Sequence, residues 1–185
     1  MGALIAGLAL WSGAHWFRRV FPHTRARLGD RRAQGVISLA VVTAIVLMAV
    51  GVRGADDTYL YTPLPHMGWV TLALMIASLY FFALPYLPGR LAGLVRHNML
   101  TGLLLWAVGH LLVNGDLVSV TLFGWMSVHA LVSMALINGR TTWERPAPGP
   151  VRNDLMNLAG VALSLLVVIV VHRWLGYDPL LGTYG

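Results

Sequence analysis

The sequence predicts an all-α protein, a polytopic bundle of about six transmembrane helices in one domain over residues 1–185. Hydrophobic residues make up 57% of the chain and charged residues only 11%, whereas soluble proteins carry about a quarter charged residues. The apolar residues gather in runs near the ~20 residues that cross a bilayer as a helix. Polar and apolar residues do not alternate within these runs, which favours helices over a transmembrane barrel.

The predicted spans are separated by short polar interruptions. The first ends in WFRRV rather than at a small-residue cleavage site, so it is interpreted as a span and not as a signal peptide. GADD follows the second span, LPGR follows the third, a tight NGD turn connects the fourth and fifth, and NGRTTWERPAPGPVRND precedes the sixth. The expected spans are 2–19, 36–53, 67–87, 98–115, 117–138 and 157–175.

Arginine sets the expected orientation. The chain contains no lysine, so its net charge of +6 comes from arginine. Cytoplasmic loops of membrane proteins carry an excess of basic residues, and only Arg53 and Arg173 lie on the side of the loops after the even-numbered spans. We therefore expect both termini outside and the other arginines in the cytoplasm: Arg18, Arg19, Arg25, Arg27, Arg31, Arg32, Arg90, Arg96, Arg140, Arg145 and Arg152.

Composition and motifs exclude several classes of protein. The absence of cysteine excludes disulfides and cysteine-held clusters. The chain has no Ser-His-acid set, phosphate-binding glycine loop or HExxH motif, and no carboxylate lies in the middle of a span, which argues against an ion-coupled pump. The basic loop RRVFPHTRARLGDRR lies beside the membrane, where arginines meet anionic lipid first. We expect the lipid bilayer as a partner and no nucleic acid.

Two stretches of the chain repeat one pattern, G-L-x-L-W-x-x-x-H. They are GLALWSGAH at residues 7–15 and GLLLWAVGH at residues 102–110. The first lies in a span that runs inward and the second in a span that runs outward, so a repeat of three plus three helices would be inverted. Coincidence is the other explanation, because glycine, leucine and tryptophan are common in membrane helices. The sequence leaves both explanations open.

The repeated pattern places a tryptophan beside a histidine on each helix. Residues four apart share a helix face, so Trp11 lies over His15, and Trp106, His110 and Asn114 line one face of the fourth span. Polar groups at membrane depth usually face the interior of the bundle. Each motif therefore predicts a flat apolar wall next to a polar ring nitrogen.

Imidazole in this setting has two interpretations. Neutral imidazole is a ligand for iron, copper or zinc, and a porphyrin with axial imidazoles suits flat aromatic neighbours. The simpler interpretation is that His15 and His110 form hydrogen bonds between helices. His129 in GWMSVHALVSM lies mid-span at a depth similar to that of His15, and it is the reserve ligand in place of His110.

The NGD turn also has two interpretations. Asn, Gly and Asp are typical of short connections, which favours a structural role for the turn. In the functional alternative, Asp116 would orient the second ring nitrogen of His110, as carboxylates do for metal-bound imidazole.

Four stretches point to a known family. They are GAHWF in the first span, the loop RARLGDRRAQGVISL, the turn LPGRLAGLVRHNMLTG and, most specifically, LWAVGHLLVNGDLVSVTLFG. Through them the chain resembles the NnrU family of bacterial integral membrane proteins. The resemblance implies a multi-pass protein of the bacterial inner (cytoplasmic) membrane with a role in nitric oxide and nitrogen-oxide metabolism.

The family has relatives among the zeta-carotene isomerases of plants and cyanobacteria, which carry haem b with histidine ligands and convert a cis central double bond of a polyene to trans. The resemblance therefore implies haem b as a cofactor, held here by His15 and His110. It also implies an apolar small-molecule substrate, such as a polyene, or nitric oxide. Function belongs to a site and not to a fold, so a second expectation stays open: a non-catalytic membrane subunit or assembly factor with structural histidines and a membrane protein partner.

One stretch departs from another pattern that it resembles. RHNMLTG is similar to the R-H-P-x-Y-x-G pattern of isoprenylcysteine-type membrane methyltransferases, but Asn98 and Leu100 replace the proline and the tyrosine. These two departures argue against a methyl-donor site.

Overall fold

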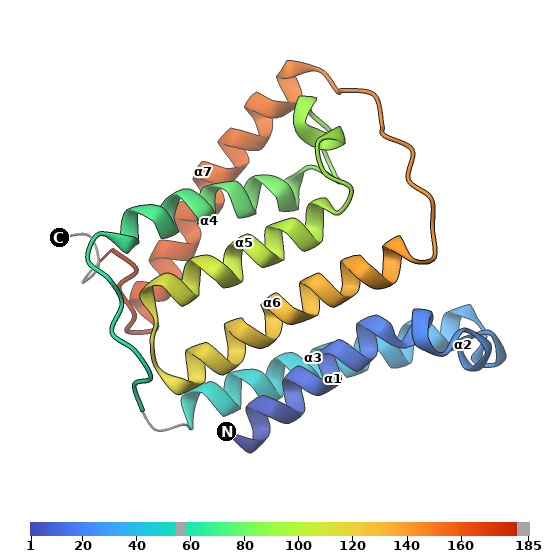
Figure 1. Cartoon of the computed structure of the whole chain (residues 1–185), viewed down its shortest axis with the longest axis horizontal. Helices are drawn as coiled ribbons and strands as arrows, with labels where there is room; N and C mark the ends of the chain where they lie inside the picture. The colour runs from blue at the N-terminus through green and yellow to red at the C-terminus, as the bar shows by residue number, and fades with distance from the viewer. Residues whose placement is uncertain (55–57, 181–185) are drawn as a thin grey trace.

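The computed structural model describes residues 1–54 and 58–180, and over these residues the regular structure is helical. The six longer helices cross the molecule one after another in alternating directions, and the short α2 joins the first two (Figure 1). The helices are α1 (Gly2–Val20), α2 (Pro22–Leu28), α3 (Asp30–Arg53), α4 (Met67–Ala83), the 3-10 helix η1 (Arg90–Gly93), α5 (Asn98–Val113), α6 (Leu117–Asn138) and α7 (Val151–Trp174).

The predicted spans match these helices with shifts at their ends. The span 117–138 coincides with α6, and the span 2–19 differs from α1 by one residue. The spans 67–87 and 98–115 were too long, because turns end α4 at Ala83 and α5 at Val113. The other two predictions began six residues late, because α3 and α7 start with polar turns that hydropathy does not mark.

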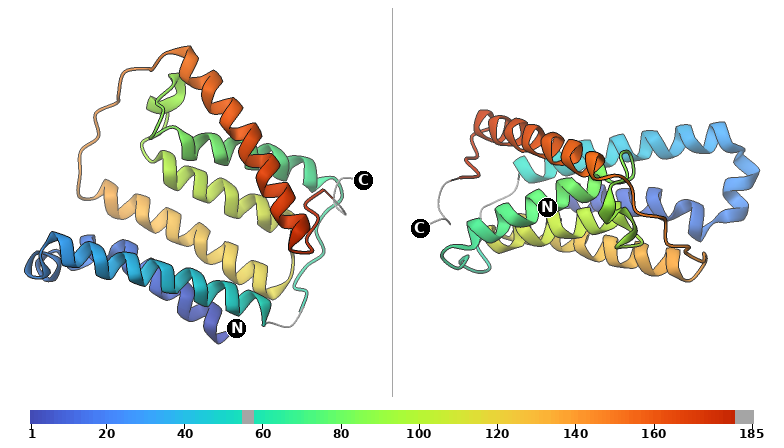
Figure 2. Two further views of the ribbon diagram at one scale, coloured as in Figure 1. Left: turned by 180° about the vertical axis from the view of Figure 1, so that it is seen from behind. Right: turned by 90° about the horizontal axis from the view of Figure 1, so that it is seen from above.

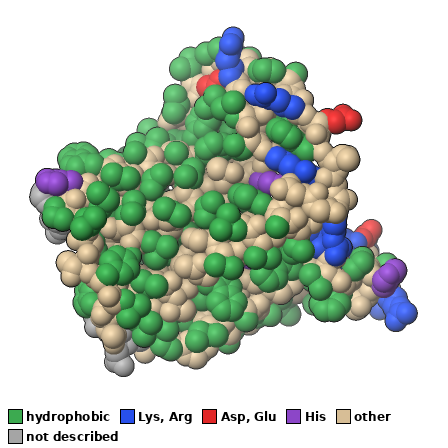
Figure 3. Space-filling model, in the orientation of Figure 1, with side chains coloured by type: hydrophobic (Ala, Val, Ile, Leu, Met, Phe, Trp, Pro, Cys, Tyr) green, Lys and Arg blue, Asp and Glu red, His purple; other side chains and the backbone are tan. Residues whose placement is uncertain are grey.

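The long helices are those of a multi-pass membrane protein. By length and composition, α3, α6 and α7 can each cross a bilayer, and α4 and α5 are shorter apolar helices. Only 11% of the most apolar stretch of α7 and 17% of that of α3 are buried inside the protein, and apolar side chains cover much of the face shown in Figure 3. Exposed apolar helix surfaces of this kind are suited to contact with the hydrocarbon chains of lipid. Six spans and an inverted repeat stay predictions.

The helices form two groups, a hairpin of α1 and α3 and a layer of α4, α5 and α6. α1 lies closely against α3, while α4, α5 and α6 pack side by side in chain order. The helices α3 and α7 lie on the same side of the layer formed by α4, α5 and α6 (Figure 2). α1 contacts α6 and so joins the hairpin to the rest.

The main apolar cluster lies where the two groups meet. Leu4 and Leu8 of α1 are fully buried and pack with Ala107 of α5 and Phe123 of α6. Trp11 and Trp106, the tryptophans of the two repeated motifs, both pack against this cluster. The two motifs therefore border the same core, and this contact does not depend on an inverted repeat.

A polar cluster fastens the start of α7 to the turn after α4. Asp154 accepts hydrogen bonds from the hydroxyl of Tyr80 and from the backbone N–H of Arg90. Asn153 and Asn157 donate their side-chain amides to the carbonyls of residues 88 and 87, at 2.7 and 2.9 Å. These contacts explain how a helix with little buried apolar surface keeps its place. The sequence alone does not predict this cluster, although two of its residues, Asn153 and Asn157, are four positions apart and so share a helix face.

Replacing Asn157 by leucine is expected to loosen α7. Asn157 is only 4% exposed, and its substitution leaves the carbonyl of Leu87 without this partner. An unpaired buried group costs about 1–3 kcal/mol, so the unfolding midpoint in detergent should fall. Leu163→Ala, on an exposed part of the same helix, is the control, and it should change the unfolding midpoint little. Equal midpoints for wild type and Asn157→Leu would contradict the role of this contact.

Arginines gather along one edge of the molecule. In Figure 3 the basic side chains of the visible face lie along the right and upper edge, where α1 and α6 end. The N-terminus and the end of α7 lie toward the opposite edge (Figure 1). This charge asymmetry agrees with the distribution seen in the sequence, and the assignment of the arginine-rich edge to the cytoplasm stays a prediction.

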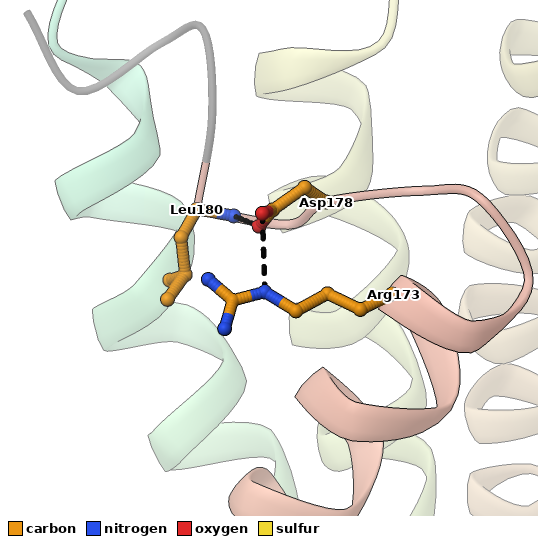
Figure 4. A network of polar contacts seen from close by, with 3 residues as sticks. All are labelled: Arg173, Asp178 and Leu180. Atoms are coloured by element: carbon orange, nitrogen blue, oxygen red, sulfur yellow. Dashed lines mark hydrogen bonds and ion pairs between the residues drawn. The ribbon is translucent and has the colours of Figure 1, made fainter.

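The segment after α7 folds back onto that helix. Arg173 donates to Asp178 at 3.1 Å, and the same carboxylate accepts the backbone N–H of Leu180 at 2.9 Å (Figure 4). The N–H of Leu180 and then Arg173 hold the pKa of Asp178 below its usual value. These contacts are present when the carboxylate is ionised and weaken as the pH falls toward its pKa.

Candidate functional site

Polar side chains of α1 and α6 form one connected network between the two helices. Trp125 donates its indole N–H to Ser12 at 2.9 Å, and Trp16 donates its indole N–H to Ser133 at 2.8 Å. His129 lies between the two hydroxyls, with Nδ1 3.0 Å from Ser12 and Nε2 3.5 Å from Ser133. Each tryptophan thus bonds the serine of the opposite helix. We call these five residues the α1–α6 seam.

The centre of the seam is buried, although Trp125 is 37% exposed, and both ring nitrogens of His129 are occupied. His129 and Ser12 are each 2% exposed, and Ser133 is 4% exposed. The Trp16 and His129 rings are stacked, with centroids 5.2 Å apart and planes 13° apart. Fully satisfied polar networks in a low-dielectric interior favour one packing over others. Both nitrogens of His129 are therefore used in holding α1 against α6.

His15 has a different arrangement from that of His129. Its Nδ1 lies 2.8 Å from the backbone carbonyl of Trp11. A carbonyl can only accept, so Nδ1 carries the proton and Nε2 of the neutral ring keeps its lone pair. The ring lies 4.2 Å from Trp11 and 5.6 Å from His129, centroid to centroid, on an exposed residue. The Nε2 lone pair is thus available for a ligand.

His110 repeats this geometry on α5. Its Nδ1 lies 2.8 Å from the carbonyl of Trp106, so its Nε2 also keeps a lone pair. The ring is half-buried, 5.1 Å from Trp106, and is stacked on Phe123 at 4.4 Å. His172 forms the same bond to the carbonyl of Val168 at 2.8 Å, so the bond itself is a local helical feature. The two motifs differ from His172 in that a tryptophan ring lies beside each histidine.

The structure places the two motif histidines in neighbouring groups. His15 lies against His129, while His110 lies against Phe123, six residues earlier on α6. Six residues correspond to about 9 Å along a helix axis. In the part of the chain that the structure describes, no three His, Asp, Glu or Cys side chains converge on a point that could hold a metal ion. A shared ligand of His15 and His110 stays a prediction, as does His129 as the reserve.

Trp11 carries an unpaired polar atom beside His15. Its indole nitrogen is buried and has no hydrogen-bond partner among the described residues. Most buried indole N–H groups find a partner, so this donor is a marker for a missing acceptor. Trp11 and His15 together therefore offer one hydrogen-bond donor and one lone pair on adjacent turns of α1.

An apolar groove of about 400 Å³ lies next to the seam. It is lined by Trp16 of α1 and by one face of α6, including Gly124, Trp125 and His129. A Cβ at Gly124 would meet no atom within 4 Å, which is consistent with open space above this residue. The sequence does not predict this groove, because the spacing of these side chains on α6 does not indicate which helix packs against them.

The NGD turn has the structural role that its composition favoured. The carboxylate of Asp116 accepts the backbone N–H of Ser119 at 2.8 Å and so caps α6. The side chain of Asn114 donates to the carbonyl of His110 at 2.8 Å where α5 ends. The functional alternative for Asp116 is wrong, because the Nδ1 of His110 is already bonded within its own helix.

The loop before α4 is held on this turn by Tyr61. The single phenol O–H is shared between the carbonyl of Leu111 and, at 2.9 Å, that of Asn114. Burial, followed by the charge of Asp116, raises the pKa of Tyr61. A raised pKa stabilises the folded state below the ordinary value near 10, and the contribution is lost as the pH rises through the folded pKa. In Tyr61→Phe, unfolding midpoints measured from pH 8 to 11 should therefore decline less steeply above pH 10 than in wild type. Tyr86→Phe, at an exposed tyrosine, is the matched control, and identical pH profiles for Tyr61→Phe and wild type would contradict the assignment.

Comparison with known proteins gives one family. No curated protein and no solved structure matches the chain. The model of the NnrU protein family matches residues 3–179, a range that contains both repeated motifs, the seam and the groove. The chain is therefore an integral membrane protein that belongs to the NnrU family.

Proposed function

We propose that this protein binds b-type haem through the Nε2 atoms of His15 and His110. The observation that carries the proposal is the setting that the two rings share: each Nδ1–H is committed to a tryptophan carbonyl at 2.8 Å, and each ring lies beside the side chain of that tryptophan. Metal-bound histidines nearly always donate their other ring N–H in this way, which sets the tautomer and the ring orientation. In both rings the nitrogen left with a lone pair is the one that would ligate iron.

The surroundings of the two rings suit a flat, largely apolar group. Trp11 and Trp106 lie beside them, and the buried indole nitrogen of Trp11 supplies a free donor for an acidic or carbonyl group. Asn114 donates to the backbone carbonyl of His110 and so fixes the end of α5, the helix that carries this ring. If one of the two imidazoles can be displaced, bound haem would supply iron for the uptake of nitric oxide or for chemistry at a double bond.

The substrate class follows from where the groove lies. Its walls are apolar and include Trp16 and His129 of the seam, so it would suit an apolar molecule that reaches it from the bilayer. The proposed function is accordingly nitrogen-oxide chemistry or cis-trans isomerisation of a polyene by a haem-dependent membrane enzyme. Trp16 and Trp125 would orient a flat substrate, and the arrangement of α1 on α6 would keep water away from it.

An absorption spectrum tests the haem proposal. We expect a b-type spectrum, oxidised and dithionite-reduced, from protein purified in detergent after expression with ample haem, and its loss in His15→Ala and in His110→Ala. His23→Ala is the matched control, because His23 lies exposed on α2 outside both motifs, and it should keep the spectrum. Circular dichroism should show that all variants keep their helices.

Two results would overturn the proposal. A featureless spectrum of the wild-type protein would favour the second function, a non-catalytic membrane subunit or assembly factor whose histidines serve packing. A spectrum that survives in His110→Ala but is lost in His129→Gln would move the second ligand to the reserve residue and reject His110.

A further inference from the structure

Three arginines converge at the end of the α1–α6 seam. Arg18 and Arg19 are in the last turn of α1, and Arg140 follows the end of α6. The guanidinium of Arg140 crosses to α1 and donates to the backbone carbonyl of Arg19. Next to it, Arg96 donates to the carbonyl and hydroxyl of Thr141 at 2.5 and 2.6 Å and so anchors the segment that carries Arg140. The side chains of Arg140 and Arg96 are thus positioned by hydrogen bonds to neutral groups rather than by acids.

The three positive charges are uncompensated within the described part of the chain. The ion pairs found there join Arg25 with Asp30 and Arg173 with Asp178, and neither involves this group. Arg18 and Arg140 both repel the charge of Arg19. Like charges held close together at a low-dielectric boundary are unfavourable, so an anion that binds among them is favoured.

The place of this group in the molecule indicates which anion. It lies on the arginine-rich edge (Figure 3), at the ends of helices whose apolar surfaces match lipid. Lipid phosphates lie at this level of a bilayer, and arginine binds phosphate through paired N–H donors. We propose that Arg18, Arg19 and Arg140 form a binding site for the phosphate of an anionic phospholipid.

A phosphate bound at this site would bridge α1 and α6. The direct packing of α1 on α6 is limited, and the polar bonds of the seam and of Arg140 are spread along it from Ser12 to Arg19. A phosphate shared by arginines of both helices bridges them at the end of this line. The lipid therefore ties the α1–α3 hairpin to the rest of the protein, independently of any haem.

Thermal unfolding with added lipid tests this site. Protein in detergent is titrated with phosphatidylglycerol and, separately, with phosphatidylcholine of the same acyl chains. We expect phosphatidylglycerol to raise the unfolding temperature at lower concentration than phosphatidylcholine. A charge-assisted hydrogen bond to phosphate contributes about ten-fold or more to affinity, so Arg18→Gln with Arg140→Gln should weaken the effect of phosphatidylglycerol at least about ten-fold.

Matched variants separate this site from general attraction. Arg27→Gln with Arg31→Gln removes the same charge from the same edge, away from the seam, and should leave the response to phosphatidylglycerol within about two-fold of wild type. Arg140→Lys keeps the charge and the fold but loses the fork of donors, and it should show an intermediate response. The proposal fails if both lipids act alike, if the Arg27/Arg31 variant loses as much as the Arg18/Arg140 variant, or if inorganic phosphate matches the effect of phosphatidylglycerol.

Discussion

Gly51→Ala is expected to destabilise the protein by about 3 kcal/mol or more. A Cβ at residue 51 would lie 2.4 Å from the backbone nitrogen of Leu4 and 2.7 Å from its Cα. Backbone atoms cannot move aside as a flexible side chain can, so α1 must shift away from α3. Overpacking usually costs about 1–3 kcal/mol, and sometimes more. The upper end applies here because Leu4 is fully buried in the main apolar cluster, which the shift would open.

A second glycine on the same helix is the matched control. A Cβ at Gly35 meets no atom within 4 Å, so Gly35→Ala should stabilise α3 by about 0.5–1 kcal/mol through helix propensity alone. The measurement is the unfolding midpoint of both variants and of wild type in the same detergent. If Gly51→Ala behaves like Gly35→Ala, the close approach of α1 to α3 is wrong.

His129→Leu is expected to cost about 2 kcal/mol. Two hydrogen bonds to Ser12 and Ser133 are lost, together with the stack on Trp16. Polar bonds in membrane proteins average about 0.6 kcal/mol each, and an aromatic pair adds about 0.5–1.5 kcal/mol. The near-ultraviolet circular dichroism of Trp16 and Trp125 should change as well, because their indoles bond the same two hydroxyls.

Two further variants separate the role of the His129 hydrogen bonds from a general effect of replacing a histidine. His129→Gln keeps a donor and an acceptor and should recover part of the stability, while His23→Leu, on the exposed surface of α2, should stay within about 0.5 kcal/mol of wild type. Because both nitrogens of His129 are occupied, His129→Gln should keep any haem spectrum. Unchanged stability of His129→Leu would show that the seam does not hold α1 on α6.

Much of this architecture was predictable because it depends on local properties of the chain. The lengths of the apolar runs determine the six long helices, and the placement of arginine predicts one basic edge. The pairing of each motif histidine with a tryptophan also follows from the sequence, because residues four apart meet on any α-helix. Even the carbonyl bonds of His15 and His110 are of this kind, since each joins a ring to the residue four positions earlier.

What lies opposite each helix depended on tertiary packing. Helical periodicity defines a face but not its neighbour, so the sequence could pair His15 with His110 as readily as with His129. The close contact of Gly51 with Leu4 places α3 against α1, and Ser12 and Trp16 of α1 then meet Trp125 and Ser133 of α6. The sequence by itself determined the helices, their charge and their histidines. Only the tertiary structure decided that His15 adjoins His129, since that contact depends on close packing between residues more than a hundred positions apart.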